Sequence, residues 1–153
     1  YRVHFTGLTH DEHGYPDLSA ETHHDVVNIW VNKIRHNADQ LVRTESYWLE
    51  DAEIVVVAYG CTARSAQRAV REARQEGIPA GLLRLISIWP FPENQFIEMG
   101  LHVEKLIVAE MNLGQISREI QRVIGRPVQG VHHAGGEMIP PGPILEAIRE
   151  AAR

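Results

Sequence analysis

The sequence predicts an α/β fold in which a largely parallel sheet is covered by helices on both faces. Two apolar runs, residues 54–59 and 105–110, show no polar alternation, which is typical of strands buried on both sides. The predicted strands alternate along the chain with helical patterns, as in parallel sheets. Gly60 stands between the first run and the helix that follows, where it lets the backbone turn sharply. The strand at residues 54–59 is therefore expected at the centre of the sheet.

The first 44 residues are expected to form an arm and a helix outside the sheet. Glycine, proline and aspartate interrupt residues 1–19, and no regular period lasts there. A helical pattern from Glu21 to about Gln40 carries a bulky apolar stripe, which needs a partner surface. The short run at residues 47–49 predicts an edge strand or the approach to the sheet. The stripe consists of Val26, Val27, Trp30, Val31 and Ile34.

The helix after Gly60 is expected to begin near Thr62, whose hydroxyl suits an N-cap position. Its inner face is mostly alanine, so the helix can lie close to the sheet. Gly77 and Pro79 mark its end. The residues expected on the inner face are Ala63, Ala66, Ala69, Val70 and Ala73.

The rest of the chain continues the alternation of strands and helices. Trp89-Pro90-Phe91-Pro92 ends the second strand, because proline cannot continue a hydrogen-bonded ladder. A turn at residues 112–114 precedes a helix with an apolar inner side. The further predicted strands are residues 81–88, 105–110 and 128–132, and the further predicted helices are residues 93–99, 115–124 and 144–152.

Length and composition indicate a globular protein with one main domain. With 153 residues, 44% hydrophobic and 23% charged, the chain can bury a real core. No apolar run approaches the ~20 residues of a membrane helix, and a net charge of −5 without a basic cluster argues against nucleic acid as the main partner. The single cysteine, Cys61, excludes a disulfide framework and favours a reducing, cytoplasmic location. A start at Tyr1 rather than methionine suggests a piece of a longer protein.

The turn at Gly60, Cys61 and Thr62 is a candidate site, because doubly wound folds bind anionic groups where a strand meets a helix N-terminus. A dinucleotide fingerprint needs three glycines and only Gly60 is present, so a plain structural turn is the favoured interpretation. A carboxylate or phosphate could bind there with Arg84 as charge partner. Cys61 could be a nucleophile, but a single unpaired cysteine is more typically a small buried residue.

Nine histidines raise the question of a metal site, but their spacing argues against one. No helical His-x-x-x-His pair with a nearby acid occurs, and adjacent histidines on a strand point to opposite faces. The loop from His10 to His13 is dense in titratable groups and could serve a site completed by another domain, although polar loop chemistry is the simpler interpretation. No nucleophile elbow or P-loop occurs. The close histidine pairs are His10/His13, His23/His24 and His132/His133.

Three stretches of the sequence are distinctive. They are Val57-Ala58-Tyr59-Gly60-Cys61-Thr62-Ala63-Arg64-Ser65-Ala66, Leu83-Arg84-Leu85-Ile86-Ser87-Ile88-Trp89-Pro90-Phe91-Pro92 and Val108-Ala109-Glu110-Met111-Asn112-Leu113-Gly114-Gln115. With them the chain resembles, over nearly its whole length, the C-terminal part of the alpha subunit of 2-oxoacid:ferredoxin oxidoreductases, above all the 2-oxoglutarate type. Residues 6–16 resemble the segment that follows the pyrimidine-binding domain in that family.

The resemblance implies a transketolase C-terminal-like domain over residues 45–153, with three layers and a mostly parallel five-stranded sheet with one antiparallel strand. Residues 1–44 would link it to a preceding pyrimidine-binding domain. The whole enzyme is implied to convert a 2-oxoacid into an acyl-CoA with thiamine diphosphate, Mg and iron–sulfur clusters, and to reduce ferredoxin. The implied partners are a beta subunit and the remaining domains of the alpha subunit. The diphosphate-binding Gly-Asp-Gly and the cluster cysteines are absent here, so this segment is expected to bind no cofactor alone.

We expect this segment to support the thiamine-binding domains and to build subunit contacts through two polar loops. The loop residues are Thr6, His10, Asp11 and Glu12 in the arm, and Asn112 and Gln115 after the third strand. Two alternatives stay open. One is a regulatory module of a thiamine-dependent dehydrogenase that binds a small anion at the Gly60 turn. The other is a domain of a related dehydrogenase that uses lipoamide, which fold analogy alone does not exclude.

Overall fold

The computed structural model describes residues 2–4 and 6–153. The described chain falls into two compact units that divide after Leu41. No helix within the described ranges is long and apolar enough to cross a membrane.

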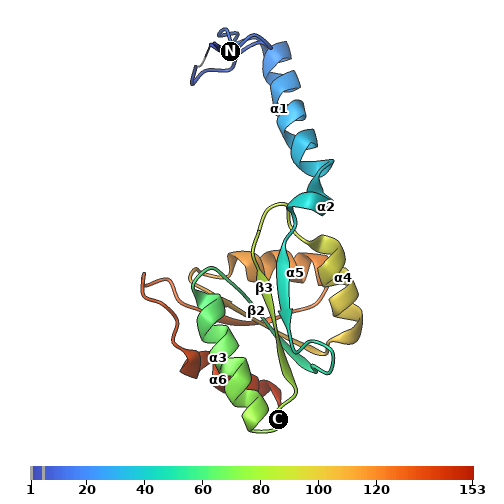
Figure 1. Cartoon of the computed structure of the whole chain (residues 1–153), viewed down its shortest axis with the longest axis vertical. Helices are drawn as coiled ribbons and strands as arrows, with labels where there is room; N and C mark the ends of the chain where they lie inside the picture. The colour runs from blue at the N-terminus through green and yellow to red at the C-terminus, as the bar shows by residue number, and fades with distance from the viewer. Residues whose placement is uncertain (1, 5) are drawn as a thin grey trace. The chain divides into compact units, whose positions relative to one another are not determined.

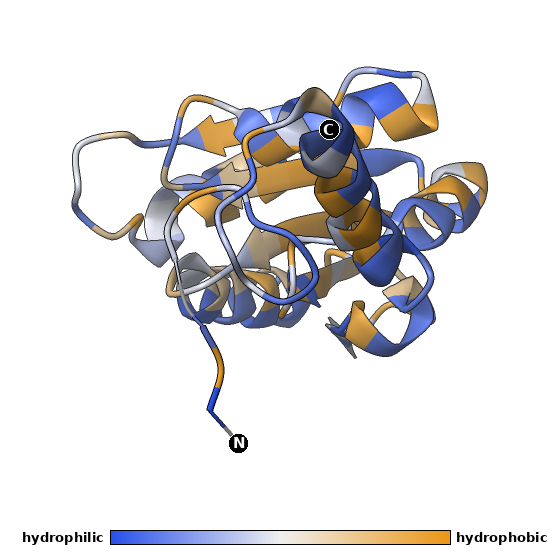
Figure 2. Cartoon of the chain, turned by 90° about the horizontal axis from the view of Figure 1, so that it is seen from above, coloured by the Kyte–Doolittle hydropathy of each residue, from blue (hydrophilic) through white to orange (hydrophobic). Residues whose placement is uncertain are grey.

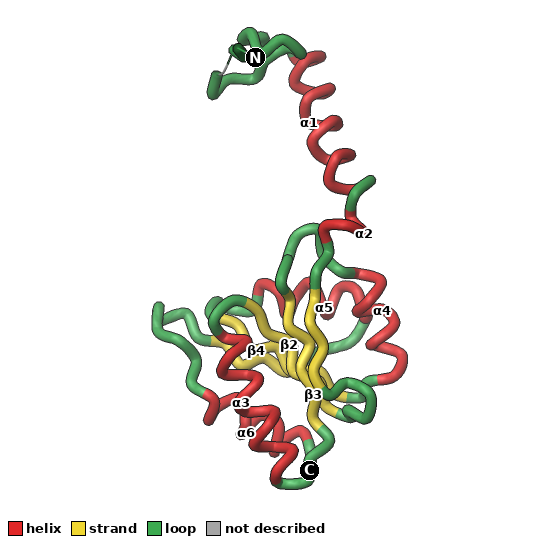
Figure 3. The backbone as a smooth tube through the Cα atoms, viewed as in Figure 1, coloured by secondary structure: helices red, strands yellow, loops and turns green. Residues whose placement is uncertain are grey.

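The second unit contains a five-stranded sheet with the strand order β1-β3-β2-β4-β5 (Figures 1 and 3). The strands are β1 (Thr44–Tyr47), β2 (Ile54–Tyr59), β3 (Ala80–Leu85), β4 (Lys105–Glu110) and β5 (Gln129–His132). β1 runs antiparallel to β3, and the other neighbouring strands are parallel. The predicted α/β fold, its one antiparallel strand and the central place of β2 are confirmed.

Helices cover both faces of this sheet. They are α3 (Thr62–Gln75), α4 (Glu93–His102), α5 (Gln115–Ile124) and α6 (Pro141–Ala151). α3 and α6 pack on one face, and α4 and α5 pack on the other. Successive residues of β2 alternate between the two cores: Val56 lies on the α3 side and Val57 on the α5 side, both fully buried. Figure 2 shows the strands mostly in the hydrophobic colour and helices with one hydrophobic and one hydrophilic side.

The alanine face of α3 packs against the sheet as predicted. Ala66, Ala69 and Ala73 are fully buried, and their small size lets the helix approach β2 closely. The prediction that Thr62 caps this helix is wrong: Thr62 is the first helical residue, is only 2% exposed, and follows Cys61 at the N-cap position. The hydroxyl is buried inside the first turn because the chain already enters the helical conformation at Cys61 (φ −69°, ψ −29°).

The strand β3 is shorter than predicted. It ends at Leu85, and the amides of Ile86 and Ser87 donate to the carbonyl of Arg43 instead of continuing the ladder. Tyr59, the last residue of β2, is paired with Leu85, so the neighbouring strand ends at the same level. Residues 86–88 are therefore connecting chain, although their sequence is suited to a strand.

The first unit consists of a loop followed by α1 (Ala20–Arg35) and the short α2 (Ala38–Leu41). The predicted continuous helix to Gln40 breaks after Arg35, where the Asn37 side chain donates to the carbonyl of Lys33 at 2.7 Å. Every residue of α1 is described, and none of them is buried. Its apolar stripe is present as predicted, and within the first unit the stripe is only partly covered, with Trp30 58% exposed.

Candidate functional site

The carboxyl ends of β2 and β4 form the topological switch point of the sheet. β2 continues through α3 to β3 on one side, whereas β4 lies on the other side of β2 and continues through α5 on the opposite face. In open α/β sheets, ligands bind in the crevice outside the strand ends at this point. Tyr59 ends β2 and Glu110 ends β4, so these two side chains stand at that position.

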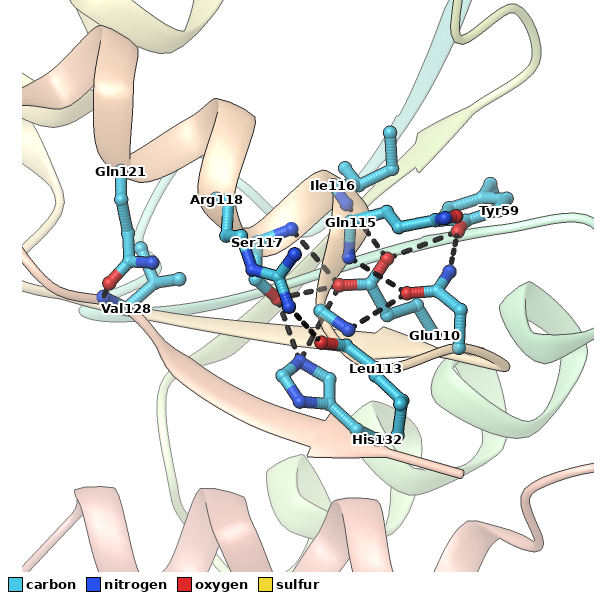
Figure 4. Close-up of polar contacts among 12 residues, drawn as sticks. Tyr59, Glu110, Leu113, Gln115, Ile116, Ser117, Arg118, Gln121, Val128 and His132 are labelled. Carbon is cyan, nitrogen blue, oxygen red and sulfur yellow. Dashed lines mark hydrogen bonds and ion pairs between the residues drawn. The ribbon is translucent and has the colours of Figure 1, made fainter. Parts of the chain in front are cut away.

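Glu110 is a buried carboxylate at the N-terminus of α5. It is 1% exposed and accepts hydrogen bonds from the Ile116 amide (2.9 Å) and from the Ser117 amide (3.0 Å). The Ser117 hydroxyl donates to it at 2.7 Å and the Tyr59 hydroxyl at 3.1 Å (Figure 4). Four donors therefore surround a charge that would be costly to bury alone.

Asn112 completes the closure of the same helix end. Its side-chain oxygen accepts from the Gly114 amide at 2.9 Å and from the Gln115 amide at 2.8 Å, and its amide group donates to the Tyr59 hydroxyl at 2.7 Å. The amides of residues 114–117, which a helix cannot satisfy internally, are thus taken by Asn112 and Glu110. The N-terminus of α5 has no free amides left for an external anion.

His132 joins this network from β5. The Ser117 hydroxyl has one proton, which it donates to Glu110, so at 2.8 Å it accepts from Nε2 of His132. The same Nε2 lies 3.4 Å from Glu110 Oε1. The imidazole occupies space that two glycines leave open, because a Cβ at Gly130 would lie 2.3 Å from its Cε1 and one at Gly114 would lie 2.8 Å away.

The electrostatics of the network fix its protonation at neutral pH. Burial alone would raise the pKa of Glu110, but the hydrogen bonds from Ser117 and Ile116 outweigh it and hold that pKa below the ordinary value. Burial first, and then the neighbouring Glu110 charge, raise the pKa of Tyr59 to about 12. Glu110 is therefore an ionised acceptor and Tyr59 a neutral donor. This suits them to orient the turn at residues 111–115 rather than to transfer protons.

The N-terminus of α3 lies on the other side of the switch point and is built differently. Gly60 has a φ of +55°, which favours glycine, and among the described residues no side chain caps the first turn of α3. Cys61 is exposed, so the expectation of a buried cysteine is wrong. It lies in the turn beyond the carboxyl end of β2, where its Sγ is 3.5 Å from Sδ of Met111. We call this helix end open, because no side chain of the described residues accepts its first backbone amides.

The structure brings two of the predicted segments together. Residues 60–62 and 112–115 come close to each other through contacts with neighbouring residues, because Asn112 donates to Tyr59, just before Gly60, and Cys61 contacts Met111, just before Asn112. Arg84 on β3 lines a small hollow of about 120 Å³ with Ala63 and the first turns of α3.

The guanidinium of Arg84, however, is already paired with a carboxylate on the neighbouring strand β1. Arg84 donates to Glu45 at 3.0 Å, and its Nε is buried with no hydrogen-bond partner within the described residues. Anion binding at Gly60, Cys61, Thr62 and Arg84 stays a prediction.

The other predicted residues lie in the first unit. Asp11 organises the loop there, because its Oδ1 accepts from the amides of His13 and Tyr15 at 2.9 Å each. His10 donates from Nδ1 to the carbonyl of Asp11 at 2.9 Å, and the Thr6 hydroxyl accepts from the amide of Leu8 at 3.2 Å. The role of this loop toward other domains stays a prediction, as does that of Asn112 and Gln115.

Sequence reasoning did not single out the residues at the centre of the network. Tyr59 and Glu110 stand in the distinctive stretches but are predicted only as strand residues, Ser117 only as part of a helix, and His132 only as one of a histidine pair on a strand. One signal was present: an acidic residue ends an otherwise apolar buried strand, two residues before Asn112. A charge at that place needs partners, and the following helix N-terminus supplies them.

Among the described residues, no three histidine, cysteine, aspartate or glutamate side chains converge on a point that could hold a metal ion. Cys61 is the single cysteine of the sequence, whereas an iron–sulfur cluster takes several thiolates. The part of the chain that the structure describes therefore offers no complete ligand set for either group.

Known proteins resemble this chain over most of its length. Residues 52–144 match the family model described as pyruvate:ferredoxin oxidoreductase core domain II. The 2-oxoglutarate synthase subunit KorA of Methanocaldococcus jannaschii is 45% identical over 150 residues, which is 97% of this chain and 40% of that relative. The ketoisovalerate oxidoreductase subunit VorB of Methanothermobacter thermautotrophicus is 45% identical over 112 residues, 72% of this chain and 32% of that relative. The chain therefore spans well under half the length of these curated relatives.

Solved structures show the same architecture. A 2-oxoglutarate:ferredoxin oxidoreductase from Magnetococcus marinus, with 2-oxoglutarate, coenzyme A and succinyl-CoA bound, has a TM-score of 0.80 and 25% identity, covering 98% of this chain and 27% of that one. A split-gene transketolase in an inactive tetramer has a TM-score of 0.60 at 21% identity, covering 72% of this chain and 41% of that one, which shows the fold alone. The expected transketolase-like fold is confirmed.

Proposed function

Because the chain belongs to the family of the pyruvate:ferredoxin oxidoreductase core domain II, we propose that it is the C-terminal part of the alpha subunit of a 2-oxoacid:ferredoxin oxidoreductase. The 45% identity to a 2-oxoglutarate synthase subunit across 97% of the chain is the observation that carries this proposal. It also favours 2-oxoglutarate as the substrate of the whole enzyme. The relatives are enzyme subunits, which favours this function over a separate regulatory module.

In the whole enzyme, thiamine diphosphate with Mg would supply the chemistry of 2-oxoacid decarboxylation, and iron–sulfur clusters would supply the electron path to ferredoxin. The described residues offer no ligand set for a metal ion, and the single cysteine cannot hold a cluster alone, so we assign the residues of this chain no step of the reaction. We propose instead that the chain supports the thiamine-binding domains and the contacts with a beta subunit. A cofactor held between domains makes such a division of labour natural.

The hydrogen-bonded network at the carboxyl ends of β2 and β4 supports this role. Glu110 and Asn112 hold the first turn of α5, and the Asn112 side chain fixes Tyr59 on the neighbouring strand. Leu113 projects from the turn and is 71% exposed, whereas Met111 is half-buried against the core on the α3 side. A turn that is held in place by buried hydrogen bonds and exposes an apolar side chain is suited to contact another protein surface.

Activity of the complete enzyme tests the substrate assignment. The full-length subunit that contains this chain, assembled with its partner subunits, should reduce ferredoxin with 2-oxoglutarate and coenzyme A. We expect kcat/KM for 2-oxoglutarate to exceed that for pyruvate and for 2-oxoisovalerate by at least about 100-fold, since a missing carboxylate leaves charged groups in the site unpaired. Equal rates with all three acids would contradict the substrate assignment, and no reduction with any 2-oxoacid would contradict the function.

Deletion of the arm tests the assembly role. Removal of residues 2–19 from the full-length subunit should weaken its association with the partner subunits and lower turnover in proportion, because that loop is proposed to face them. Size-exclusion chromatography with light scattering measures the assembly, and ferredoxin reduction measures turnover. Unchanged assembly and turnover would contradict a role of the arm in assembly, and only the turn at residues 111–115 would remain as the proposed contact.

A further inference from the structure

A hollow in the first unit lies between the loop at residues 10–12 and the N-terminal half of α1. It has a volume of about 360 Å³. Its apolar floor comes from Val26, Ile29 and Trp30, of which Ile29 is 62% and Trp30 58% exposed. Asp11, Glu12 and Asp25 form its rim. An exposed apolar surface bounded by charge is typical of a site that another protein covers.

The hollow is held in shape by the loop itself. Asp17 accepts a hydrogen bond from the Thr22 hydroxyl at 2.8 Å, and the Thr9 hydroxyl lies 3.2 Å from Nδ1 of His23, so the loop is tied twice to α1. Oδ1 of Asp11 holds the tip of the loop by accepting two backbone amides. A preformed site loses less conformational entropy when it binds.

The rim carboxylates have no lysine or arginine partner within the described residues. Asp25 has no hydrogen-bond or ion-pair partner there, Glu12 lies 3.5 Å from Nε2 of His13 on an exposed loop, and Asp11 accepts only backbone amides. The residues that line the hollow include three carboxylates and His10 but no lysine or arginine. A complementary occupant is therefore cationic at its tip and apolar along its stem.

We propose that this hollow receives an arginine side chain from a separate partner subunit. The guanidinium plane can stack on the Trp30 indole and form paired hydrogen bonds with a carboxylate, while its methylene stem covers Val26. A rim of one charge sign also speeds the encounter of separate chains, an advantage that a segment tethered to the same polypeptide does not need. The inference rests on the proposed function in requiring that the chain works inside a multi-subunit enzyme.

A matched pair of double variants tests the charge. In the full-length subunit, Glu12→Gln with Asp25→Asn should weaken association with the partner subunits by about 10-fold or more and flatten its salt dependence, because the arginine loses its anionic partners. Asp11 is left intact because it holds the loop. The control combines Glu21→Gln with Asp39→Asn, which removes the same charge from exposed positions outside the hollow and should change the affinity less than about 2-fold.

Trp30→Ala tests the floor of the hollow. Trp30 is exposed, so its removal should leave folding intact but weaken association by about 10-fold, and Trp30→Phe should restore part of that loss. Equal affinities for the charge variant and its control would overturn the proposal. So would a loss of thermal stability in the isolated subunit with unchanged association, since the arginine would then come from the same polypeptide. Charge-dependent association in a complex that oxidises no 2-oxoacid would support the docking site and overturn the proposed function.

Discussion

The N-termini of α3 and α5 occupy equivalent places at the switch point, yet only that of α5 is closed. Each helix follows a central parallel strand and begins at the same edge of the sheet. Glu110 and Asn112 take the amides at the start of α5, whereas among the described residues no side chain caps α3. Topology therefore gives two anion-attracting helix ends, and one buried carboxylate decides which of them stays open.

The largest effect is expected where the closed end loses its carboxylate. Glu110→Ala leaves the amides of residues 116 and 117 and the Tyr59 hydroxyl without their acceptor in a buried place. We expect the free energy of unfolding to fall by about 3 kcal/mol, since each buried donor without a partner carries its own desolvation cost.

Urea unfolding followed by circular dichroism measures this change. The exposed Glu98→Ala on α4 serves as control and should stay within about 0.5 kcal/mol of the wild type. A loss as small as that of the control would mean that the network does not stabilise the helix end.

Glu110 should also make the free energy of unfolding depend on pH in the acid range. The pKa of Glu110 in the folded chain is lowered, so its stabilisation is present above the unfolded pKa of about 4.3 and is lost as the pH falls through the folded value. The free energy of unfolding should therefore decrease as the pH is lowered from about 5 toward 3.

Glu110→Gln isolates this contribution, because it should show a weaker pH dependence over that window. The lowered pKa values of Asp51 and Glu76 are common to both proteins and cancel in the comparison. Parallel pH profiles for wild type and variant would contradict the assignment.

A smaller loss is expected when the hydroxyl between Glu110 and His132 is removed. Ser117→Ala deletes the 2.7 Å bond to the carboxylate and the acceptor for the imidazole, but keeps the backbone amide in place. We expect a decrease of about 1–2 kcal/mol in the free energy of unfolding. A double-mutant cycle with Glu110→Ala should be non-additive, because both changes remove the same hydrogen bond. Additive losses would show that Ser117 acts independently.

The smallest effect, a gain, is expected at the open end. Arg64 is exposed in the first turn of α3, where a positive side chain opposes the helix dipole. Arg64→Glu should raise the free energy of unfolding by about 0.5–1 kcal/mol at low salt, with the gain fading as salt increases. Arg71→Glu, farther along the same exposed face, should change stability little. Equal gains at both positions would indicate a general charge effect instead of an unsatisfied helix end.

The strands and helices could be predicted because their periods and glycine or proline boundaries are local features. The run at residues 105–110 and the helix at residues 115–124 agree with β4 and α5 in both bounds. The helix break after Arg35 was missed, since a side-chain bond from Asn37 ends a pattern that apolar spacing alone would continue.

The polar network could not be derived from the sequence, because its members come from four separate elements. Tyr59, Glu110, Ser117 and His132 meet only once β2, β4 and β5 are in register and α5 is placed over them. From the sequence, Gly60 indicates a candidate site at the N-terminus of α3, whereas at the N-terminus of α5 only a polar turn is predicted. Local rules identify where a helix starts, but not which distant side chain satisfies its amides.

The imidazole of position 132 lies where side chains of residues 114 and 130 would have to be. A side chain at residue 130 therefore requires the imidazole to move or to be replaced by something smaller, whereas residue 114 is restricted to glycine by its φ of +90° as well. We expect evolutionary change at residue 130 to be coupled to residue 132, and residue 114 to stay glycine whichever side chain stands at 132.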